Sequence, residues 1–396
     1  MKPKNSPFNL GRLGWGAARL LALTLAAVLP PLHAQPVATA WVNCASQPVP
    51  PPSGAFVVTA VGDLTLSGRA EGNAGAMRAF APILHGADLA LANLEGAITE
   101  REASLKPFIP GKSYPFRFPA GAAAQLAGVG FDVVSVANNH SNDYGPDGIS
   151  DTMVHLARAG VVATGLAGEF ALAQWSGKRV AVLAFSPYGR HNNVTQLTQA
   201  ARMVRLARRH ADLVVVTFHG GAEGDAGAVL AGGDETYAGE DRGNPRRFAQ
   251  TVVAAGADLV LGHGPHVLRP LECIQGKLVA YSLGNFVSAG GLSARNLANV
   301  TAVLEAALHP QTGHLQAVRL WPATFNARRL PVPDASGRAA WLVNWLGTVS
   351  GQSVPGWRPL WLPGFEGRAA TFAKWLAGTQ LARCVHAATP APECAR

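Results

Sequence analysis

The feature that most constrains the fold of this chain is an alternation of short apolar runs with helical segments. The apolar runs are short enough to be buried strands, and they span 56–61, 87–92, 133–137, 179–185, 213–218, 258–261 and 278–283. Helical patterns span 74–84, 120–126, 147–159, 198–210 and 244–255. Residues 300–308 and 314–320 read as a closing antiparallel pair, and residues 321–396 as irregular and Trp-rich. The rhythm predicts an α/β protein built on layered sheets.

Polar residues end most of these runs, and this pattern predicts where ligands bind. The residues at or just beyond the run ends are Asp63, Glu95, Asn139 with His140, His219, His263 with His266, and Asn285. Because ligands of α/β sheets bind beyond the carboxyl ends of the strands, we expect these side chains to meet at one rim. Carboxylates, amides and imidazoles without thiolates form a mixed oxygen and nitrogen set, which suits Mn, Fe or Zn.

The number of these groups is sufficient for one or two metal ions. Two ions bridged by a carboxylate clamp a phosphoryl or acyl oxygen and activate water near neutral pH. Asn138, Asp143, Glu223 and Asn285 are expected beside the metal, binding substrate or supporting the ligands. Taken singly, each residue also has a structural interpretation, such as a helix cap for Asp63 or a core histidine for His140. The interpretation as a metal site therefore depends on these side chains meeting at one rim of the sheets.

The first 34 residues read as a secretory signal peptide. Four basic residues precede or border the apolar run 20–29, and Leu32-His33-Ala34 offers a cleavage site before Gln35. The run is short for a membrane span, so an uncleaved anchor is the alternative. We expect a periplasmic or extracellular protein, anchored to the membrane if the leader stays. Removing the leader lowers the formal charge from +9 to +5, a mildly basic surface that suits an acidic polymer or phosphate substrate.

The remaining composition limits the class of protein. Apolar residues make up 48% and charged residues 14% of the 396 residues, which excludes a disordered chain. No nucleic-acid motif is present, so no nucleic-acid partner is expected. Four arginines at helical spacing, Arg202, Arg205, Arg208 and Arg209, read first as a solvated helix face, with contact to an acidic polymer as the alternative. The expected organisation is a signal peptide (1–34), a linker (35–54), a main domain (55–325) and a Trp-rich extension (326–396).

Four cysteines in an exported chain permit two disulfides in three pairings. Cys384 and Cys394 can close a small C-terminal loop, which would leave Cys44 to reach Cys273. Their dispersal argues against a zinc knuckle.

Several of these motifs, in this order, resemble the CapA-type capsule-synthesis proteins. The resemblance covers about residues 56–290 and rests on Gly62-Asp63-Leu64-Thr65, Asn93-Leu94-Glu95, Asn138-Asn139-His140 with Asp143 and Gly145, His219-Gly-Gly-Ala-Glu223, Gly262-His263-Gly-Pro-His266 and Tyr281-Ser-Leu-Gly-Asn285-Phe286. The family is associated with poly-γ-glutamate capsule synthesis or export. Its domain resembles the calcineurin-like metallophosphoesterases, which implies a four-layer αββα sandwich.

The resemblance also assigns roles to residues. By analogy, Asp63, Glu95, Asn139, His219, His263 and His266 would bind metal, and His140 would donate a proton to the substrate. Two features depart from the metallophosphatase pattern: Thr65 stands where the first motif has a histidine, and two residues rather than one separate His263 from His266. These departures leave open whether one ion or two are bound.

Two functions fit this sequence. The first is an exported metal-dependent hydrolase, resembling a phosphoesterase, that acts on a phosphoester or an amide of an anionic envelope polymer such as poly-γ-glutamate. The second is a non-enzymatic factor that uses the same rim to hold the polymer or a membrane-bound partner of capsule synthesis. Metal content and turnover of a generic phosphodiester discriminate between them.

Overall fold

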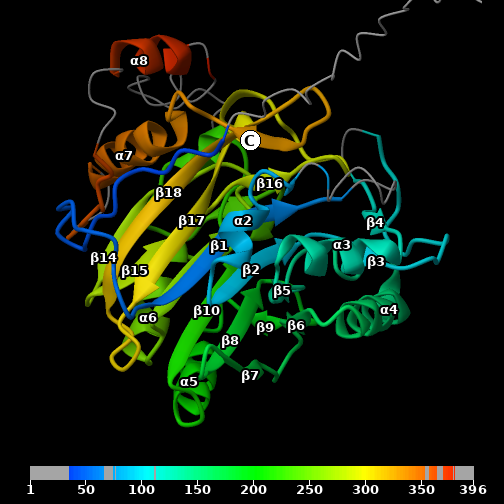
Figure 1. Cartoon of the computed structure of the whole chain (residues 1–396). Coiled ribbons are helices and arrows are strands. Elements are labelled where there is room, and N and C mark those ends of the chain that lie inside the picture. Colours follow the sequence, from blue (N-terminus) through cyan, green and yellow to red (C-terminus); the bar gives the residue numbers. More distant parts are fainter. Residues whose placement is uncertain are drawn as a thin grey trace, which may run out of the picture. The chain divides into compact units, whose positions relative to one another are not determined.

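Two β-sheets form the centre of this protein (Figure 1). The strand order of the first is β19 (Pro331–Pro333), β18 (Leu315–Phe325), β17 (Val300–Leu308), β1 (Phe56–Leu64), β2 (Leu89–Leu94), β5 (Val133–Ser135) and β6 (Val162–Thr164), with β16 (Asn285–Val287) also paired to β1. The order of the second is β14 (Leu271–Ile274), β15 (Lys277–Ala280), β13 (Leu259–His263), β10 (Leu213–His219), β8 (Lys178–Ser186) and β7 (Ala171–Trp175), with β9 (Asn192–Asn193) paired to β8.

The structure is a computed structural model that describes residues 35–66, 75, 77–110, 113–352, 356–363, 369–377 and 379. These residues belong to one compact unit, Ala34–Arg396. The predicted signal peptide, Cys384 and Cys394 lie outside the described residues. None of the described helices is both long and apolar enough to cross a membrane.

Apolar side chains from both sheets meet in a shared core. Val58 and Leu91 of the first sheet belong to the same buried cluster as Val182, Val215 and Leu261 of the second. On each strand, the residues next to these core residues point to the outer face of the sheet, because successive side chains of a strand alternate between its two faces. These two inner faces form the middle of the molecule.

Helices cover both outer faces. On the first sheet, α3 (Gly121–Val129) and the short α2 (Ala81–His85) contribute to a second cluster, which α4 (Gly145–Arg158) joins through Leu156. On the second sheet, α5 (Leu197–Arg208) and α6 (Pro245–Ala254) form a third cluster. The predicted four-layer αββα sandwich is therefore confirmed.

Aspartates stand at the amino-terminal edge of both sheets and bind the neighbouring strand. The carboxylates of Asp88, Asp132, Asp212 and Asp258 accept hydrogen bonds from the backbone N–H groups of Val57, Ala90, Arg179 and Val214, at 2.7, 2.7, 2.9 and 2.8 Å. Each aspartate precedes a strand, and each returns its own N–H to the carbonyl of the same partner residue. They fix the start of each strand pair.

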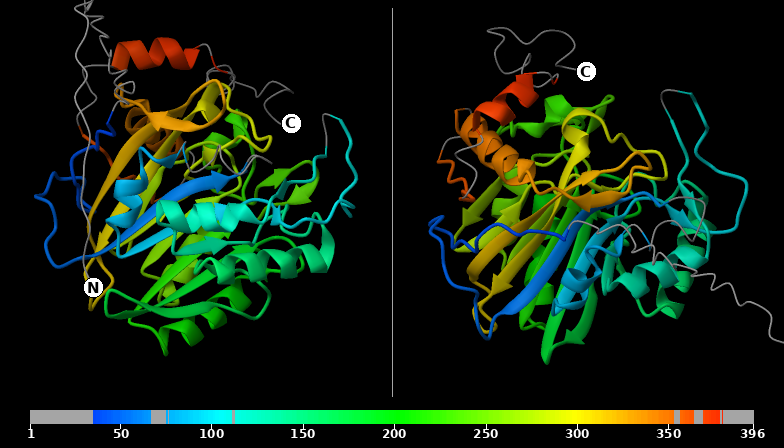
Figure 2. Two further views of the ribbon diagram at one scale, coloured as in Figure 1. Left: turned by 45° about the vertical axis from the view of Figure 1, so that its right-hand side comes forward. Right: turned by 45° about the horizontal axis from the view of Figure 1, so that its top comes forward.

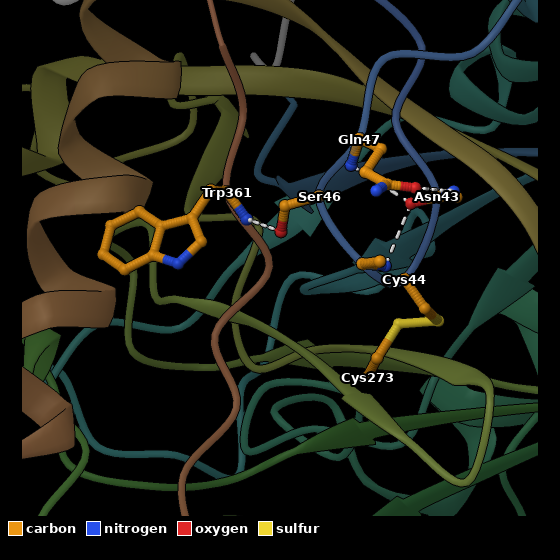
Figure 3. The surroundings of a disulfide bond; sticks show 7 residues. Asn43, Cys44, Ser46, Gln47, Cys273 and Trp361 are labelled. Carbon is orange, nitrogen blue, oxygen red and sulfur yellow. Dashed lines mark hydrogen bonds between the residues drawn. A yellow bond between two sulfur atoms is a disulfide. The ribbon is translucent and has the colours of Figure 1, made fainter.

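The segment predicted as a linker packs against the first sheet. Val42 forms an isolated bridge with Val318 of β18, and the ring of Trp41 is buried under the guanidinium of Arg319. Cys44 forms a disulfide with Cys273 of β14, one of the pairings that the sequence left open. Figure 3 shows this bond beside the hydrogen bond from the Trp361 N–H to Ser46 Oγ.

Part of the C-terminal region is regular, so the prediction of an irregular segment after residue 321 is wrong there. β18 continues to Phe325, and β19, α7 (Arg338–Gly351) and α8 (Ala369–Ala377) follow. In Figure 1 and Figure 2, α7 lies beside β17 and β18, and its residues Leu342 and Leu346 complete the central core. Trp341 and Trp345, four residues apart, stack on each other as expected of packing residues.

The helix predicted over 74–84 is interrupted by a turn. Among the described residues, Gly75 and Met77 are helical, residues 78–80 form the turn, and α2 begins at Ala81 with a proline in its first turn. Because proline lacks an N–H and has a preset φ, it favours a helix start at this place.

Candidate metal centre

Strand register brings the predicted polar residues together. Asp63 at the end of β1 pairs with Asn93 of β2 on one side and with Asn285 of β16 on the other. On the second sheet, His219 of β10 lies opposite His263 of β13. The polar ends of both sheets thus lie at one edge, as the sequence predicted.

Two glycines allow the backbones at this edge to approach closely. A methyl group at Gly62 would lie 2.0 Å from the carbonyl oxygen of Gly284, and one at Gly262 would lie 2.2 Å from that of Tyr281. Only glycine fits such contacts. These glycines immediately precede Asp63 and His263 and so help to place both side chains.

Asp63 joins the two sheets. Its Oδ2 accepts a hydrogen bond from His266 Nδ1 at 3.0 Å, and its Oδ1 accepts one from Asn93 Nδ2 at 2.9 Å. His263 Nδ1 lies 3.2 Å from Oδ1. His266 has a φ of 60°, a left-handed conformation that is uncommon for a residue other than glycine, and strain of this kind often accompanies functional sites.

Asp63, Glu95 and His219 lie close enough together to hold a metal ion. Each offers one ligand atom, and these atoms lie within 4.8 Å of one another. All three residues are buried. Several polar atoms here have no hydrogen-bond partner within the described part of the chain, namely Glu95 Oε1, His219 Nδ1 and His263 Nε2. Buried groups without partners are costly, and a cation would satisfy them.

The charges of these residues are strongly coupled. Burial raises the pKa of Glu95 to about 8, although the positive charge of His266 opposes this effect. Burial alone would lower the pKa of His266, but the charges of Glu95, Asp63 and Glu223 outweigh it and raise that pKa to about 10. For Asp63, burial raises the pKa, yet the contacts with His263 and His266 dominate and hold it well below its usual range. In the metal-free protein, a protonated His266 therefore neutralises the carboxylates.

His140 is held on one side of this group by a separate set of contacts. Its Nδ1 donates to Asp143 Oδ2 at 2.8 Å, and its ring stacks on Phe116 with 4.0 Å between the centroids. Lys106 Nζ lies 3.4 Å from Asp143 Oδ1 and 3.3 Å from His140 Nδ1. Burial lowers the pKa of His140, and the Asp143 contact opposes that shift.

The two asparagines before His140 occupy different environments. Asn138 Nδ2 donates to Asn93 Oδ1 at 3.0 Å, and Asn93 in turn donates to Asp63, so Asn138 is linked to the metal group. Asn139 Oδ1 is buried with no hydrogen-bond partner among the described residues. Metal binding by Asn139 stays a prediction, while Asn93 is hydrogen-bonded directly to Asp63 and Asn138 is linked to it through Asn93.

The other predicted residues lie around the same edge. Glu223 Oε2 is 3.8 Å from His266 Nε2, and Asn285 Oδ1 accepts from His266 Nδ1 at 3.0 Å. Thr65, at the position where the metallophosphatase pattern has a histidine, donates its hydroxyl to the carbonyl of Val287. The Thr65 hydroxyl is therefore hydrogen-bonded to the backbone of the neighbouring strand β16.

Arg242 is a residue that the sequence analysis missed. Its guanidinium is buried, donates to His219 Nε2 at 3.3 Å and forms an ion pair with Glu223 at 2.8 Å. It follows the hairpin of β11 (Thr236–Tyr237) and β12 (Glu240–Asp241), and it also donates to Tyr188 Oη. No local motif marks it, because its role depends on a loop folding back onto β10.

That loop is less solvated than its acidic composition indicated. Glu235 is buried and binds the guanidinium of Arg269 at 2.7 Å. A buried arginine at position 269, which composition does not reveal, is the reason.

His191 connects the two sheets beside the site. Its Nε2 is hydrogen-bonded to Ser141 Oγ at 2.9 Å, and its Nδ1 to Ser186 Oγ at 2.8 Å. Ser141 follows His140, whereas Ser186 ends β8 and accepts the N–H of Tyr188. A chain of contacts thus runs from the His140 loop to Tyr188 and Arg242, and it fixes the separation of the two halves of the site.

Comparison with known proteins identifies the family. The sequence model described as "Bacterial capsule synthesis protein PGA_cap" matches residues 57–290. The chain belongs to this family. The family resemblance seen in the sequence is therefore confirmed.

The sequence identity to individual members of the family is low. The chain is 28% identical to "PGA biosynthesis protein CapA" of Bacillus subtilis over 52% of its own length and 54% of that protein. It is 26% identical to a "Probable polyglutamine synthesis accessory protein" of Mycobacterium tuberculosis, over 66% of its own length and 72% of the relative. The chain thus spans only about half the length of the Bacillus relative.

A solved structure of a purple acid phosphatase from yellow lupin is also similar, with 10% identity and a TM-score of 0.32, covering 72% of this chain and 56% of that one.

Proposed function

We propose that this protein is an exported accessory protein of capsule or poly-γ-glutamate synthesis that carries a metal-dependent hydrolase site. The observation that carries the proposal is the buried group of Asp63, Glu95 and His219, with the oriented His140 beside it. Family membership supports the role in polymer synthesis. The substrate class is a phosphoester or an amide of an anionic envelope polymer.

The residues present fit a divalent metal ion. Asp63, Glu95 and His219 would hold it, and the unpartnered atoms of Glu95 and His263 would gain a partner. The mixed oxygen and nitrogen donors suit Mn, Fe or Zn. When bound, such an ion supplies Lewis-acid polarisation of a phosphoryl or acyl oxygen.

The chain's own residues would perform the proton transfer and hold the substrate. Asp143 and Phe116 fix the ring of His140, so that Nε2 is the nitrogen that exchanges a proton with the substrate. Asp143 determines the tautomer by accepting from Nδ1. Arg242 and Lys106 place positive charge on either side of the group, where an anionic substrate would be stabilised.

The proposed location is outside the cytoplasm, either periplasmic or extracellular. The signal-peptide pattern of residues 1–34 and the Cys44–Cys273 disulfide support it, because disulfides persist in oxidising compartments. Membrane-bound proteins of capsule synthesis are the proposed partners.

The test measures metal content and turnover on the purified full chain. We expect a stoichiometric transition metal and hydrolysis of bis(p-nitrophenyl) phosphate, both lost in Glu95→Gln and His219→Ala. His210→Ala, an exposed histidine at the end of α5, is the matched control and should change neither. Retention of metal in Glu95→Gln would contradict the proposed ligand set.

A non-enzymatic polymer-binding factor is the second candidate. Two cationic groups already stand among the proposed ligands: His266 contacts Asp63, and Arg242 donates to His219. This arrangement would hold carboxylates of a polymer without a metal. A metal-free protein that binds polyglutamate but does not hydrolyse the phosphodiester would favour it.

A further inference from the structure

We propose that the exposed arginines of α5 and α6 form a binding surface for an acidic polymer with closely spaced carboxylates. We call Arg202, Arg205, Arg209 and Arg247 the arginine face. This inference rests on the proposed role in polymer synthesis and deepens it, because it locates the polymer on the outside of the second sheet, away from the metal ligands.

The charges of the arginine face are uncompensated. Arg202, Arg205 and Arg209 follow one another at intervals of three and four residues, so they project from one side of α5. All three are exposed, as is Arg247 in the first turn of α6, and none of the four is in an ion pair with another described residue. α5 and α6 contain no acidic residue.

Arg208 has a different role and is not part of this face. Its guanidinium forms an ion pair with the buried Asp258 at 2.6 Å and donates to the carbonyl of Ala211. One arginine of the helix therefore anchors α5 to the sheet, while the other three carry free charge into solvent. This division is the structural reason to separate the arginine face from an ordinary set of surface ion pairs.

An open, shallow groove includes two of the four arginines. It has a volume of about 510 Å³ and is lined by Arg202 and Arg247 with Thr195, Gln196, Leu197, Thr198 and Gln199. Amide and hydroxyl side chains between two guanidinium groups offer both charge and hydrogen bonds to a carboxylate.

One residue of the groove wall lies close to a chain neighbour of the candidate metal centre. Gly243 lies so close to Val194 and Thr195 that a methyl group at this position would be 3.4 and 3.6 Å from their side chains. Gly243 is flanked by Arg242, which binds His219, and by Asn244, which caps α6 by accepting the N–H of Arg247 at 2.9 Å. Thr195 of the groove thus lies beside Gly243, whose neighbour in the chain, Arg242, contacts the proposed ligand His219.

The chemistry of the surface favours an acidic polypeptide over a membrane or a nucleic acid. The apolar side of α5 is buried in the core through Ala200, Met203, Val204 and Ala207, so it is not free to enter a bilayer. No aromatic side chain lines the groove, which removes the stacking contacts that single-stranded nucleic acids use.

The spacing also matches a polypeptide. Arg202 and Arg209 are about 10 Å apart along the helix axis, since each residue adds about 1.5 Å. An extended α-linked polypeptide advances about 3.3–3.6 Å per residue, so about three acidic residues of such a chain would span that length, and fewer residues of a γ-linked chain, whose backbone repeat is longer.

The test compares binding of fluorescently labelled polyglutamate by the full chain and by two triple variants. Arg202→Gln/Arg205→Gln/Arg209→Gln removes three charges of the arginine face. Arg158→Gln/Arg295→Gln/Arg328→Gln removes the same charge from exposed positions elsewhere. We expect the first variant to bind about tenfold or more weakly, with a smaller salt dependence, and the second to bind like the parent chain.

Several results would overturn the proposal. Unchanged binding by the arginine-face variant would do so, as would an equal loss in both variants, which would show that only net charge matters. Lost binding to phosphatidylserine vesicles with unchanged polyglutamate binding would make a membrane the partner instead.

The same proteins separate this inference from the hydrolase proposal. The arginine-face variant should keep its metal content and its turnover of the small phosphodiester, because none of its changed residues contacts the site. Glu95→Gln should lose metal and still bind polyglutamate. A parent chain that contains no transition metal and does not hydrolyse the phosphodiester, but loses polyglutamate binding in the arginine-face variant, would leave the arginine face supported and contradict the hydrolase.

Discussion

The two edges of the sheets use similar residues in opposite ways. β13 begins after Asp258 and ends at His263, and both side chains are buried. Asp258 binds Arg208, Lys277 and the N–H of Val214, at 2.6, 2.8 and 2.8 Å. His263 Nε2 has no partner in the described part of the chain.

The difference teaches how this fold divides its functions. At the amino-terminal edge, every aspartate that precedes a strand and accepts a backbone N–H fastens two strands together. At the carboxyl-terminal edge, buried ionisable groups face one another, and some of their polar atoms have no hydrogen-bond partner among the described residues, which costs stability and creates a site for a cation. Substitutions at the amino-terminal edge should therefore lower the free energy of unfolding, and removal of a buried charge at the carboxyl-terminal edge should raise it.

The largest effect is expected for Asp258→Ala. Removing this carboxylate leaves Arg208 and Lys277 without their buried partner, and the free energy of unfolding should fall by about 3–5 kcal/mol. Urea denaturation measures the change, with the exposed Asp234→Ala as control. A loss below about 1 kcal/mol would show that the amino-terminal edge does not stabilise the fold as described.

The next largest effect concerns His191, which is hydrogen-bonded to Ser141 and Ser186, and the dependence of stability on pH that it causes. Burial lowers the pKa of His191 to about 4, below the ordinary value near 6.5. The unfolded chain therefore binds the proton more tightly, and the contribution of His191 to stability is lost as the pH falls from about 6.5 to 4. Between pH 7 and pH 4.5 this loss is about 2–3 kcal/mol.

His191→Gln tests this contribution because glutamine does not titrate in this range. The fall in unfolding free energy between pH 7 and pH 4.5 should be smaller in the variant than in the parent chain by about 2–3 kcal/mol. Urea denaturation at both values gives the comparison. Equal falls in the two proteins would mean that His191 is not held neutral.

Glu95→Gln should change the free energy of unfolding in the direction opposite to Asp258→Ala. Because burial raises the pKa of Glu95 to about 8, the folded protein holds at pH 7 a proton that the unfolded chain releases. Removing the ionisable group should raise the unfolding free energy of the metal-free protein by about 2–3 kcal/mol. Denaturation in the presence of a chelator measures it. A destabilised variant would erase the contrast between the edges.

The smallest effect is expected for Asp132→Ala. It removes one hydrogen bond, from the N–H of Ala90, and should lower the unfolding free energy by about 1 kcal/mol. Thermal denaturation is sensitive enough, and metal content should not change. Loss of metal in this variant would mean that the two edges are coupled through the strands.

Much of the fold could be predicted because strand and helix patterns are local. The runs at 56–61 and 213–218 became β1 and β10, and the segment 198–210 became α5. The region after residue 321 could not, since α7 is apolar on several sides and its register depends on packing against β17 and β18. The aspartates before the strands have a readable signal in Gly-Ala-Asp-Leu at 86–89 and 256–259.

The candidate site shows the same division. Asp63, Glu95, His219 and His263 could be selected from the sequence, because each ends an apolar run and such ends meet at one edge. Arg242 and His191 could not be selected. Their partners, His219 and Ser141, lie 23 and 50 residues away and contact them only after the loops fold.

The sequence by itself determined the strand ends, the family and the types of donor atom available to a metal. Only the tertiary structure decided which of these donors face one another: Asn138 rather than Asn139 is hydrogen-bonded toward Asp63, and His266 neutralises the carboxylates. The physical reason is that burial and partner distance set the cost of a charge. Both quantities arise only when strands far apart in the chain share an edge.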